Sequence, residues 1–195
     1  MGQYWIPVNL DKREFIDPHR LGTGMKLWEQ LANHPGTGAA LVVLLATERE
    51  RRGGGDLDIE ENWHGLDMPE DYPEIARRTI GRWAGDRIAI IGDYAERDDL
   101  EGFEADFIYD LCCSPEEKEE AVAFYRNRAE TENNPHLAEY FREKANRLSQ
   151  AEVFKDITDD VAKVLEHELQ GQFVGEGWRT FQPFNRKEVE PCATS

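Results

Sequence analysis

Two helix-start signals stand close together in the second half of this sequence, and they constrain the fold more than any other feature. Ser114 is a typical N-cap residue, Pro115 suits the first helical position, and Glu117 stands where a capping box needs its acidic partner. A second start, Asn-Pro at 134–135, is followed by apolar residues at helical spacing. The sequence therefore predicts a two-helix hairpin at about 115–151.

Two apolar patterns predict strands. The run Ile88–Ile91, bounded by Gly85 and Gly92, is typical of a strand buried on both faces, which would be the central strand of a sheet. Residues 4–10 alternate between two sets of side chains, as a half-buried strand does. Pro7 favours an edge position or a bulge for that strand, because it cannot donate a ladder hydrogen bond.

The remaining segments complete an α+β pattern: a small, mostly antiparallel sheet with an N-terminal hairpin, covered by helices. Residues 1–182 are expected to form a single α+β domain, followed by a loose C-terminal tail over 183–195. Further strands are expected at 13–16, at 107–111 beside 87–92, at 154–157, and as a closing hairpin within 173–181. Further helices are expected over 23–32 with Thr23 as N-cap, over 39–50, from Pro73, and from Thr158 to Gly171.

Charge is concentrated in two segments. Residues 56–74 carry eight acidic residues and no Lys or Arg, and residues 98–120 carry ten acidic residues and one Lys, so the two segments account for the net charge of −17. Such a surface repels the phosphates of nucleic acids and anionic membranes. It favours a basic protein partner, or simply solubility. The candidate partner-binding residues are Glu60, Glu61, Asp98 and Asp99.

Cysteine usage and the lack of targeting patterns favour the cytoplasm. The sequence has three Cys, an odd number, and the adjacent pair Cys112 and Cys113 cannot form an ordinary disulfide without strain. Both are expected to be core side chains rather than nucleophiles. No signal-peptide pattern is visible, and no apolar run approaches the ~18 residues that a membrane helix needs. These patterns leave the oligomeric state open.

A second candidate site surrounds the apolar run at 88–91. Arg82 and Arg87 belong to a basic cluster that could hold a phosphate or a carboxylate, and Asp86 and Asp93 bracket the run. With His19, these residues are the candidate ligand-binding residues. The alternative for the arginines is salt bridging to the acidic segments. The sequence identifies no catalytic residue and no cofactor, and it leaves metal binding open.

The segment 88–98 resembles the second metal-binding motif of calcineurin-like phosphoesterases, a strand followed by Gly-Asp-x-x-Asp-Arg. Gly92, Asp93 and Arg97 carry the resemblance, and Glu96 stands at the position of the motif's second Asp. The resemblance implies an aspartate that bridges two metal ions, which activate water. The companion motifs Gly-Asp-x-His and Gly-Asn-His-Glu do not occur in this sequence.

Three blocks are similar to a group of short uncharacterised proteins from bacteria and their phages. The first opens Met1-Gly2-Gln3-Tyr4 and continues with Val-Asn-Leu-Asp-Lys at 8–12; the others are Gly-Arg-Trp-Ala-Gly-Asp-Arg at 81–87 and Phe-Lys-Asp-Ile-Thr at 154–158. The resemblance implies a single folded unit. It brings no activity, ligand or site residue.

Two functional hypotheses follow. The first is a non-enzymatic acidic cytoplasmic protein that binds a macromolecular partner, a basic protein surface, through its acidic segments; a phage or host-defence setting would suit a small acidic inhibitor. The alternative is a small-molecule or nucleotide binder, or a metal-dependent phosphoesterase-like hydrolase, centred on residues 82–93. Direct binding to nucleic acid or to a membrane is not expected.

Overall fold

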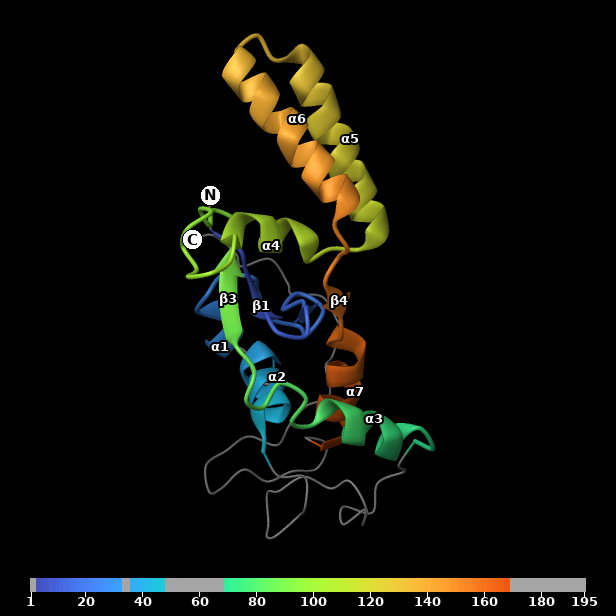
Figure 1. Ribbon diagram of the computed structural model, residues 1–195. Coiled ribbons are helices and arrows are strands. Elements are labelled where there is room, and N and C mark those ends of the chain that lie inside the picture. Colours follow the sequence, from blue (N-terminus) through green and yellow to red (C-terminus); the bar gives the residue numbers. More distant parts are fainter. Residues whose placement is uncertain (1–2, 33–35, 48–68, 169–195) are drawn as a thin grey trace, which may run out of the picture. The chain divides into compact units, whose positions relative to one another are not determined.

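The computed structural model describes residues 3–32, 36–47 and 69–168, and the chain separates into two compact units (Figure 1). Unit 1 comprises residues 1–17, 25–28 and 85–158, and unit 2 comprises residues 18–24, 29–84 and 159–195. The single domain over 1–182 stays a prediction. The expected tail at 183–195 and the expected hairpin at 173–181 lie outside the described residues.

Unit 1 is built on a four-stranded sheet in the order β3-β1-β2-β4. The strands are β1 (Trp5–Asn9), β2 (Glu14–Phe15), β3 (Ile88–Gly92) and β4 (Lys155–Asp156). β1 pairs antiparallel with both β2 and β3, whereas β2 pairs parallel with β4. The predicted α+β fold, with its N-terminal hairpin and mostly antiparallel sheet, is therefore confirmed.

β3 is an edge strand of this sheet, and the prediction of a central strand was wrong. Only β1 pairs with it among the described residues, and Ile90 is 39% exposed. The apolar run was correctly assigned to a strand, but the composition of a run does not reveal how many strands pair with it.

The strand expected at 107–111 beside β3 is instead a helix, α4 (Ala105–Leu111). Ala105, Ile108 and Leu111 are its buried residues, and their spacing of three is helical. The alternating aromatic and apolar residues of this short segment fit a strand equally well, so periodicity alone misassigned it.

β1 lies inside the sheet although it contains Pro7, so the expected edge position was also wrong. The Pro7 carbonyl accepts a hydrogen bond from the Ile16 N–H at 3.2 Å. Ile16 follows Phe15, the last residue of β2. Pro7 and Ile16 face each other one position beyond the last β1–β2 pair. The hydrogen bond that Pro7 cannot donate would therefore lie outside the β1–β2 ladder, and its absence weakens the sheet little.

The predicted helical hairpin is present as α5 (Pro115–Thr131) and α6 (Pro135–Gln150). Ser114 Oγ accepts from the Glu117 N–H at 3.1 Å, and the Glu117 carboxylate accepts from the Ser114 N–H at 2.8 Å. Asn134 caps α6 by accepting from the His136 N–H at 3.0 Å. Both helix starts are confirmed.

The contact between α5 and α6 is a narrow seam. Val122 and Ala129 are the buried residues of α5, and Ala138 and Ala145 are buried on α6 together with Leu148. Each pair is spaced by seven residues, the repeat of a coiled coil. Because three of these five side chains are only methyl groups, the seam covers little of either helix, and most of the hairpin surface is exposed.

Unit 2 contains α1 (Glu29–Ala32), α2 (Gly36–Leu45), α3 (Tyr72–Thr79) and α7 (Thr158–Glu168). The predicted inner face of α3 and the residues after it is confirmed, since Tyr72, Ala76, Thr79, Ile80 and Trp83 are all buried. Val161, Val164 and Leu165 of α7 are buried as predicted. The expected end of that helix near Gly171 lies outside the described residues.

The helix expected over 23–32 is limited to α1. Thr23 is buried and does not act as its N-cap: its hydroxyl donates to the Pro18 carbonyl at 2.9 Å and contacts the Thr37 hydroxyl at 3.0 Å. Trp28, expected on the inner face, is 75% exposed. α2 begins earlier than expected, and Val42 is exposed, so that helix is not buried all round.

No helix among the described residues combines the length and the apolar content needed to cross a membrane.

The capping box gives the first testable prediction. Ser114→Ala removes the acceptor for the Glu117 N–H and should lower the free energy of unfolding by about 1 kcal/mol. Ser149→Ala is the matched control, because Ser149 lies on the exposed face of α6 and donates only to the Asn146 carbonyl. Urea unfolding of the two variants would contradict the capping role if both lost the same stability.

Candidate functional site

Asp86 and Arg87, two of the predicted ligand-binding residues, hold the turn between β1 and β2. Asp86 Oδ2 accepts from Asn9 Nδ2 at 2.7 Å and forms an ion pair with Lys12. Asp11 accepts from Arg87 Nε at 2.8 Å and from the Arg87 backbone N–H at 2.7 Å. Hydrogen bonds from Arg87 lower the pKa of Asp11, and those from Lys12 and then Asn9 lower the pKa of Asp86.

Asp93 stands at the other end of β3. Its Oδ1 accepts from the Tyr4 N–H at 3.0 Å, and its own N–H donates to the Tyr4 carbonyl at 2.9 Å. The five residues of β3 separate Asp93 from Asp86 and Arg87. Within unit 1 the structure thus brings two of the candidate residues together and holds the third apart.

The other two candidates belong to unit 2. His19 is exposed in the turn at 18–21, and Arg82 Nη1 donates to the Arg78 carbonyl at 3.3 Å. Arg78 in turn pairs with Asp160 at 2.7 Å and with Glu74 at 3.6 Å, and of these two acids only Glu74 belongs to an acidic segment. The assignment of all five residues to one ligand site stays a prediction.

The structure divides the acids of segment 98–120 into paired and unpaired groups. Glu104 pairs with both Arg97 and Arg147. Asp110 lies 2.7 Å from Lys144 Nζ. Lys144 and Arg147 lie one turn apart on the same face of α6. This face therefore neutralises Asp110 and Glu104, which belong to the acidic segment 98–120.

The Asp110–Lys144 pair is mostly buried, with 20% and 15% of the side chains exposed. Burial raises the pKa of Asp110, and Lys144 opposes that rise. For Lys144, burial works against the charged form, but the hydrogen bond to Asp110 and the attraction between the charges outweigh it and raise the pKa. The 2.7 Å contact favours the charged form of each group in the presence of the other.

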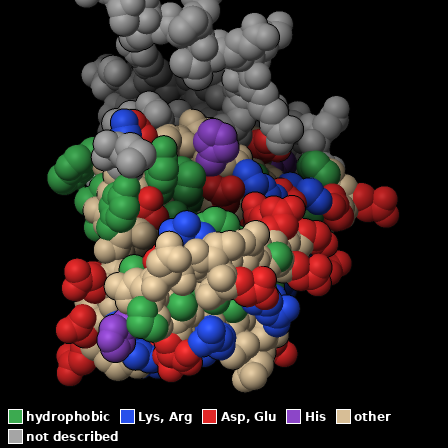
Figure 2. Space-filling model, turned by 90° about the horizontal axis from the view of Figure 1, so that it is seen from above, with side chains coloured by type: hydrophobic (Ala, Val, Ile, Leu, Met, Phe, Trp, Pro, Cys, Tyr) green, Lys and Arg blue, Asp and Glu red, His purple; other side chains and the backbone are tan. Residues whose placement is uncertain are grey.

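Four acids without a Lys or Arg partner in the described part of the chain lie in the loop between β3 and α4, residues 94–104, which we call the acidic loop; others, among them Glu116 and Glu120, lie on α5. The four acids of the acidic loop are Glu96, Asp98, Asp99 and Glu101, and their side chains are exposed. Asp99 Oδ2 accepts from the Glu96 N–H at 2.8 Å, which shapes the loop. Figure 2 shows acidic side chains on one face of the molecule, interspersed with Lys and Arg side chains and with scattered apolar ones. Glu60 and Glu61 lie outside the described residues.

Comparison with known protein families, characterised proteins and solved structures found no match.

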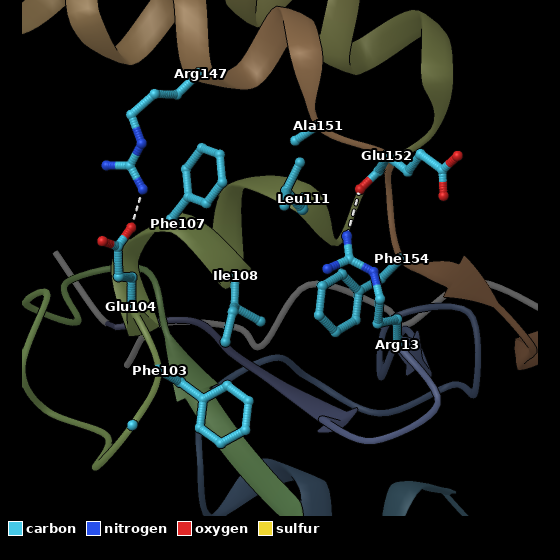
Figure 3. Close-up of a pocket in the computed structure, with 11 residues that line it drawn as sticks. Arg13, Phe103, Glu104, Phe107, Ile108, Leu111, Arg147, Ala151, Glu152 and Phe154 are labelled. Atoms are coloured by element: carbon cyan, nitrogen blue, oxygen red, sulfur yellow. Dashed lines mark hydrogen bonds and ion pairs between the residues drawn. The ribbon is translucent and has the colours of Figure 1, made fainter.

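A groove of ≈ 640 Å³ in unit 1 was not anticipated from the sequence (Figure 3). It lies beside α4 and the segment that leads from α6 to β4. Its lining comes from three separated stretches of sequence, at 13, 102–111 and 147–154, so no local sequence motif predicts the groove. The lining residues are Arg13, Gly102, Phe103, Glu104, Phe107, Ile108, Leu111, Arg147, Ala151, Glu152 and Phe154.

Arginine side chains lie over the aromatic rings of this groove. The Arg147 guanidinium lies 4.3 Å from the centre of the Phe107 ring, and that of Arg13 lies 4.7 Å from the centre of Phe154. Such cation–π contacts hold a planar guanidinium against an apolar wall. The groove therefore combines fixed positive groups with an apolar surface.

The exposed surface of the α5–α6 hairpin carries a chain of aromatic contacts. The ring centres of Phe124 and Tyr125 lie 5.4 Å apart, those of Tyr125 and Phe141 lie 6.1 Å apart, and those of Tyr140 and Phe141 lie 5.6 Å apart. Phe124 is 58% exposed and Tyr140 is 49% exposed. We call these four residues the aromatic chain.

Neither described cysteine has the properties of a nucleophile. Cys112 and Cys113 are free thiols at the end of α4, where a strand end had been expected. Burial raises the pKa of Cys112 above its ordinary value, and burial raises the pKa of Cys113 to about 11. Both thiols are protonated at neutral pH and therefore unreactive. Among the described residues, no three His, Cys, Asp or Glu side chains converge to hold a metal ion.

The Asp11–Arg87 contact gives a prediction about pH. Because Arg87 lowers the pKa of Asp11, Arg87→Gln should move the NMR titration midpoint of the Asp11 carboxyl upward, toward 3.8. The folded pKa lies below the unfolded one, so the contribution of Asp11 to stability is present above about pH 4 and is lost as the pH falls through the folded pKa. Arg126→Gln, on the exposed surface of α5, should leave the midpoint where it is. An unchanged midpoint in Arg87→Gln would refute the assignment.

Proposed function

We propose that this chain is a non-enzymatic binding protein that docks a basic segment of a protein partner on unit 1. The observation that carries the proposal is the acidic loop, whose four exposed carboxylates lack a cationic side chain among the described residues. Other acids of the same segment, Glu104 and Asp110, have such partners. The contrast distinguishes the acidic loop from these neutralised acids and favours it as a place that can accept positive charge from a partner.

The α5–α6 hairpin supplies apolar surface for the same kind of partner. Glu116, Glu120 and Phe124 follow each other at a spacing of four on α5, so they share one exposed helix face. Aromatic side chains are enriched where proteins meet, and partner charge is best recognised beside such surface. A basic partner with some apolar side chains suits a face of this composition better than a nucleic acid does.

Glu60 and Glu61, which lie outside the described residues, belong to the proposal as sequence-based candidates for partner binding. The free thiols of Cys112 and Cys113 support a reducing compartment, and we propose the cytoplasm. A phage or host-defence setting would suit such a protein if it acts as a small acidic inhibitor of a basic one.

The alternative, a ligand or phosphoesterase-like site over 82–93, draws less support. Asp86 is engaged with Lys12 and Asn9, and Arg87 is engaged with Asp11. A ligand at this place would first have to displace these internal bonds. We therefore place the binding of a basic partner ahead of it.

Charge reversal tests the proposal. A triple variant, Asp98→Lys, Asp99→Lys and Glu101→Lys, should weaken binding to a lysine-rich peptide, measured by calorimetry at low salt, by at least tenfold and should flatten the salt dependence. The matched control reverses Glu130, Glu143 and Glu166, which are exposed elsewhere and change the net charge equally. Equal losses in both variants would mean that only the overall charge matters, and the acidic loop would not be the docking surface. A third variant, Glu60→Lys with Glu61→Lys, tests the two sequence-based candidates and should also weaken binding.

A further inference from the structure

Two arginines and two glutamates line the groove of unit 1: Arg13, Arg147, Glu104 and Glu152. Glu104 is a single carboxylate shared by Arg97 and Arg147. Arg13 has no carboxylate partner among the described residues. Figure 3 shows the Glu152 carboxylate directed away from the other lining side chains. The charges that face the groove therefore favour an anion.

Arg13 is held ready for such an anion. Its Nη2 donates to the Glu152 carbonyl at 2.7 Å, and its guanidinium lies over Phe154. Its backbone has a φ of 54°, a left-handed conformation that is uncommon for a residue other than glycine, and its carbonyl accepts from the Lys155 N–H at 2.8 Å. The guanidinium is thus oriented by uncharged groups, and its remaining N–H donors stay available for a carboxylate.

The rest of the groove is apolar. Between Arg13 and Arg147 the lining consists mainly of carbon, supplied by Phe103, Phe107, Ile108, Leu111, Ala151 and Phe154. The groove has a volume of ≈ 640 Å³ and is largely open to solvent, so a small organic ligand would lie along it with one side exposed. The apolar lining needs a ligand with an apolar body of its own.

We propose that this groove binds a small monocarboxylate with an apolar, preferably aromatic, body. The carboxylate lies against the Arg13 guanidinium, and the body lies along the wall formed by Phe107, Ile108 and Leu111. A polyanion such as a nucleoside triphosphate is disfavoured, because one guanidinium without a counter-ion cannot balance several charges and the acidic loop itself supplies Gly102, Phe103 and Glu104 to the lining. This site adjoins the acidic loop, which supplies Gly102, Phe103 and Glu104 to its lining, but it takes a ligand of opposite charge to the basic partner proposed above.

Three probes separate the contributions of charge and body: naphthylacetate, the neutral naphthylacetamide, and acetate. Each is titrated into the full chain and followed by amide and methyl NMR shifts. Naphthylacetate should shift the signals of Ile108 and Leu111 and bind at least tenfold more tightly than either analogue. Equal binding of the acid and the amide would overturn the proposal, as would the absence of shifts at the groove.

Variants test the residues. Arg13→Gln keeps the length of the side chain without the charge and should weaken naphthylacetate binding about ten- to a hundredfold, whereas Arg126→Gln should leave it unchanged. Ala151→Leu places extra side-chain volume in the groove and should also weaken binding, whether or not Arg13→Gln folds. Melting temperatures near that of the parent establish folding. A folded Arg13→Gln or Ala151→Leu with parental affinity would refute the site.

Discussion

The buried side chain of Asn9 is the interaction on which unit 1 depends. Its Oδ1 accepts from the N–H groups of Asp11 and Lys12, and its Nδ2 donates to Asp86. One fully buried amide thereby fixes the turn after β1 and ties it to the residues that lead into β3. A buried amide left without these partners would cost about 1 to 3 kcal/mol for each lost bond, so the turn and the sheet form together.

The conformation of Arg13 follows from that turn and joins the sheet to the groove. The turn delivers the chain to β2 with Arg13 in a left-handed conformation, which presents its carbonyl to β4 and its guanidinium to Phe154. The parallel β2–β4 pair, the only parallel one in this sheet, is therefore connected to the proposed ligand site through a single residue. The backbone of Arg13 thus contributes to the sheet, and its side chain contributes to the proposed ligand site.

The features that the sequence predicted correctly are those determined by neighbouring residues. The capping residues Ser114 and Asn134 determine helix starts through bonds to residues two or three positions away, so the hairpin at 115–151 could be predicted closely. The position of β3 at the sheet edge could not, because it depends on which distant segment pairs with it. The segment 105–111 is short enough that both a strand period and a helical period fit it.

The candidate site was harder still to foresee. The sequence does not reveal whether an acidic side chain has a cationic partner. The cations that neutralise Glu104 and Asp110 lie on α6, more than 30 residues further along the chain. The groove is assembled from Arg13, the region of α4, and the end of α6, so no spacing rule connects its parts. Sequence reasoning found the acidic segments as a whole, and only the fold distinguishes their unpaired members.

The seven-residue seam of the α5–α6 hairpin has a consequence for how this fold can change over evolutionary time. Because Val122, Ala129, Ala138 and Ala145 repeat with that period, inserting or deleting one repeat in each arm returns every seam residue to the facing position. The contacts at the base of the hairpin, which are the Asp110–Lys144 pair and the packing of Leu148 in the core, would stay unchanged. Relatives of this protein can therefore differ in hairpin length by whole repeats while keeping the same sheet.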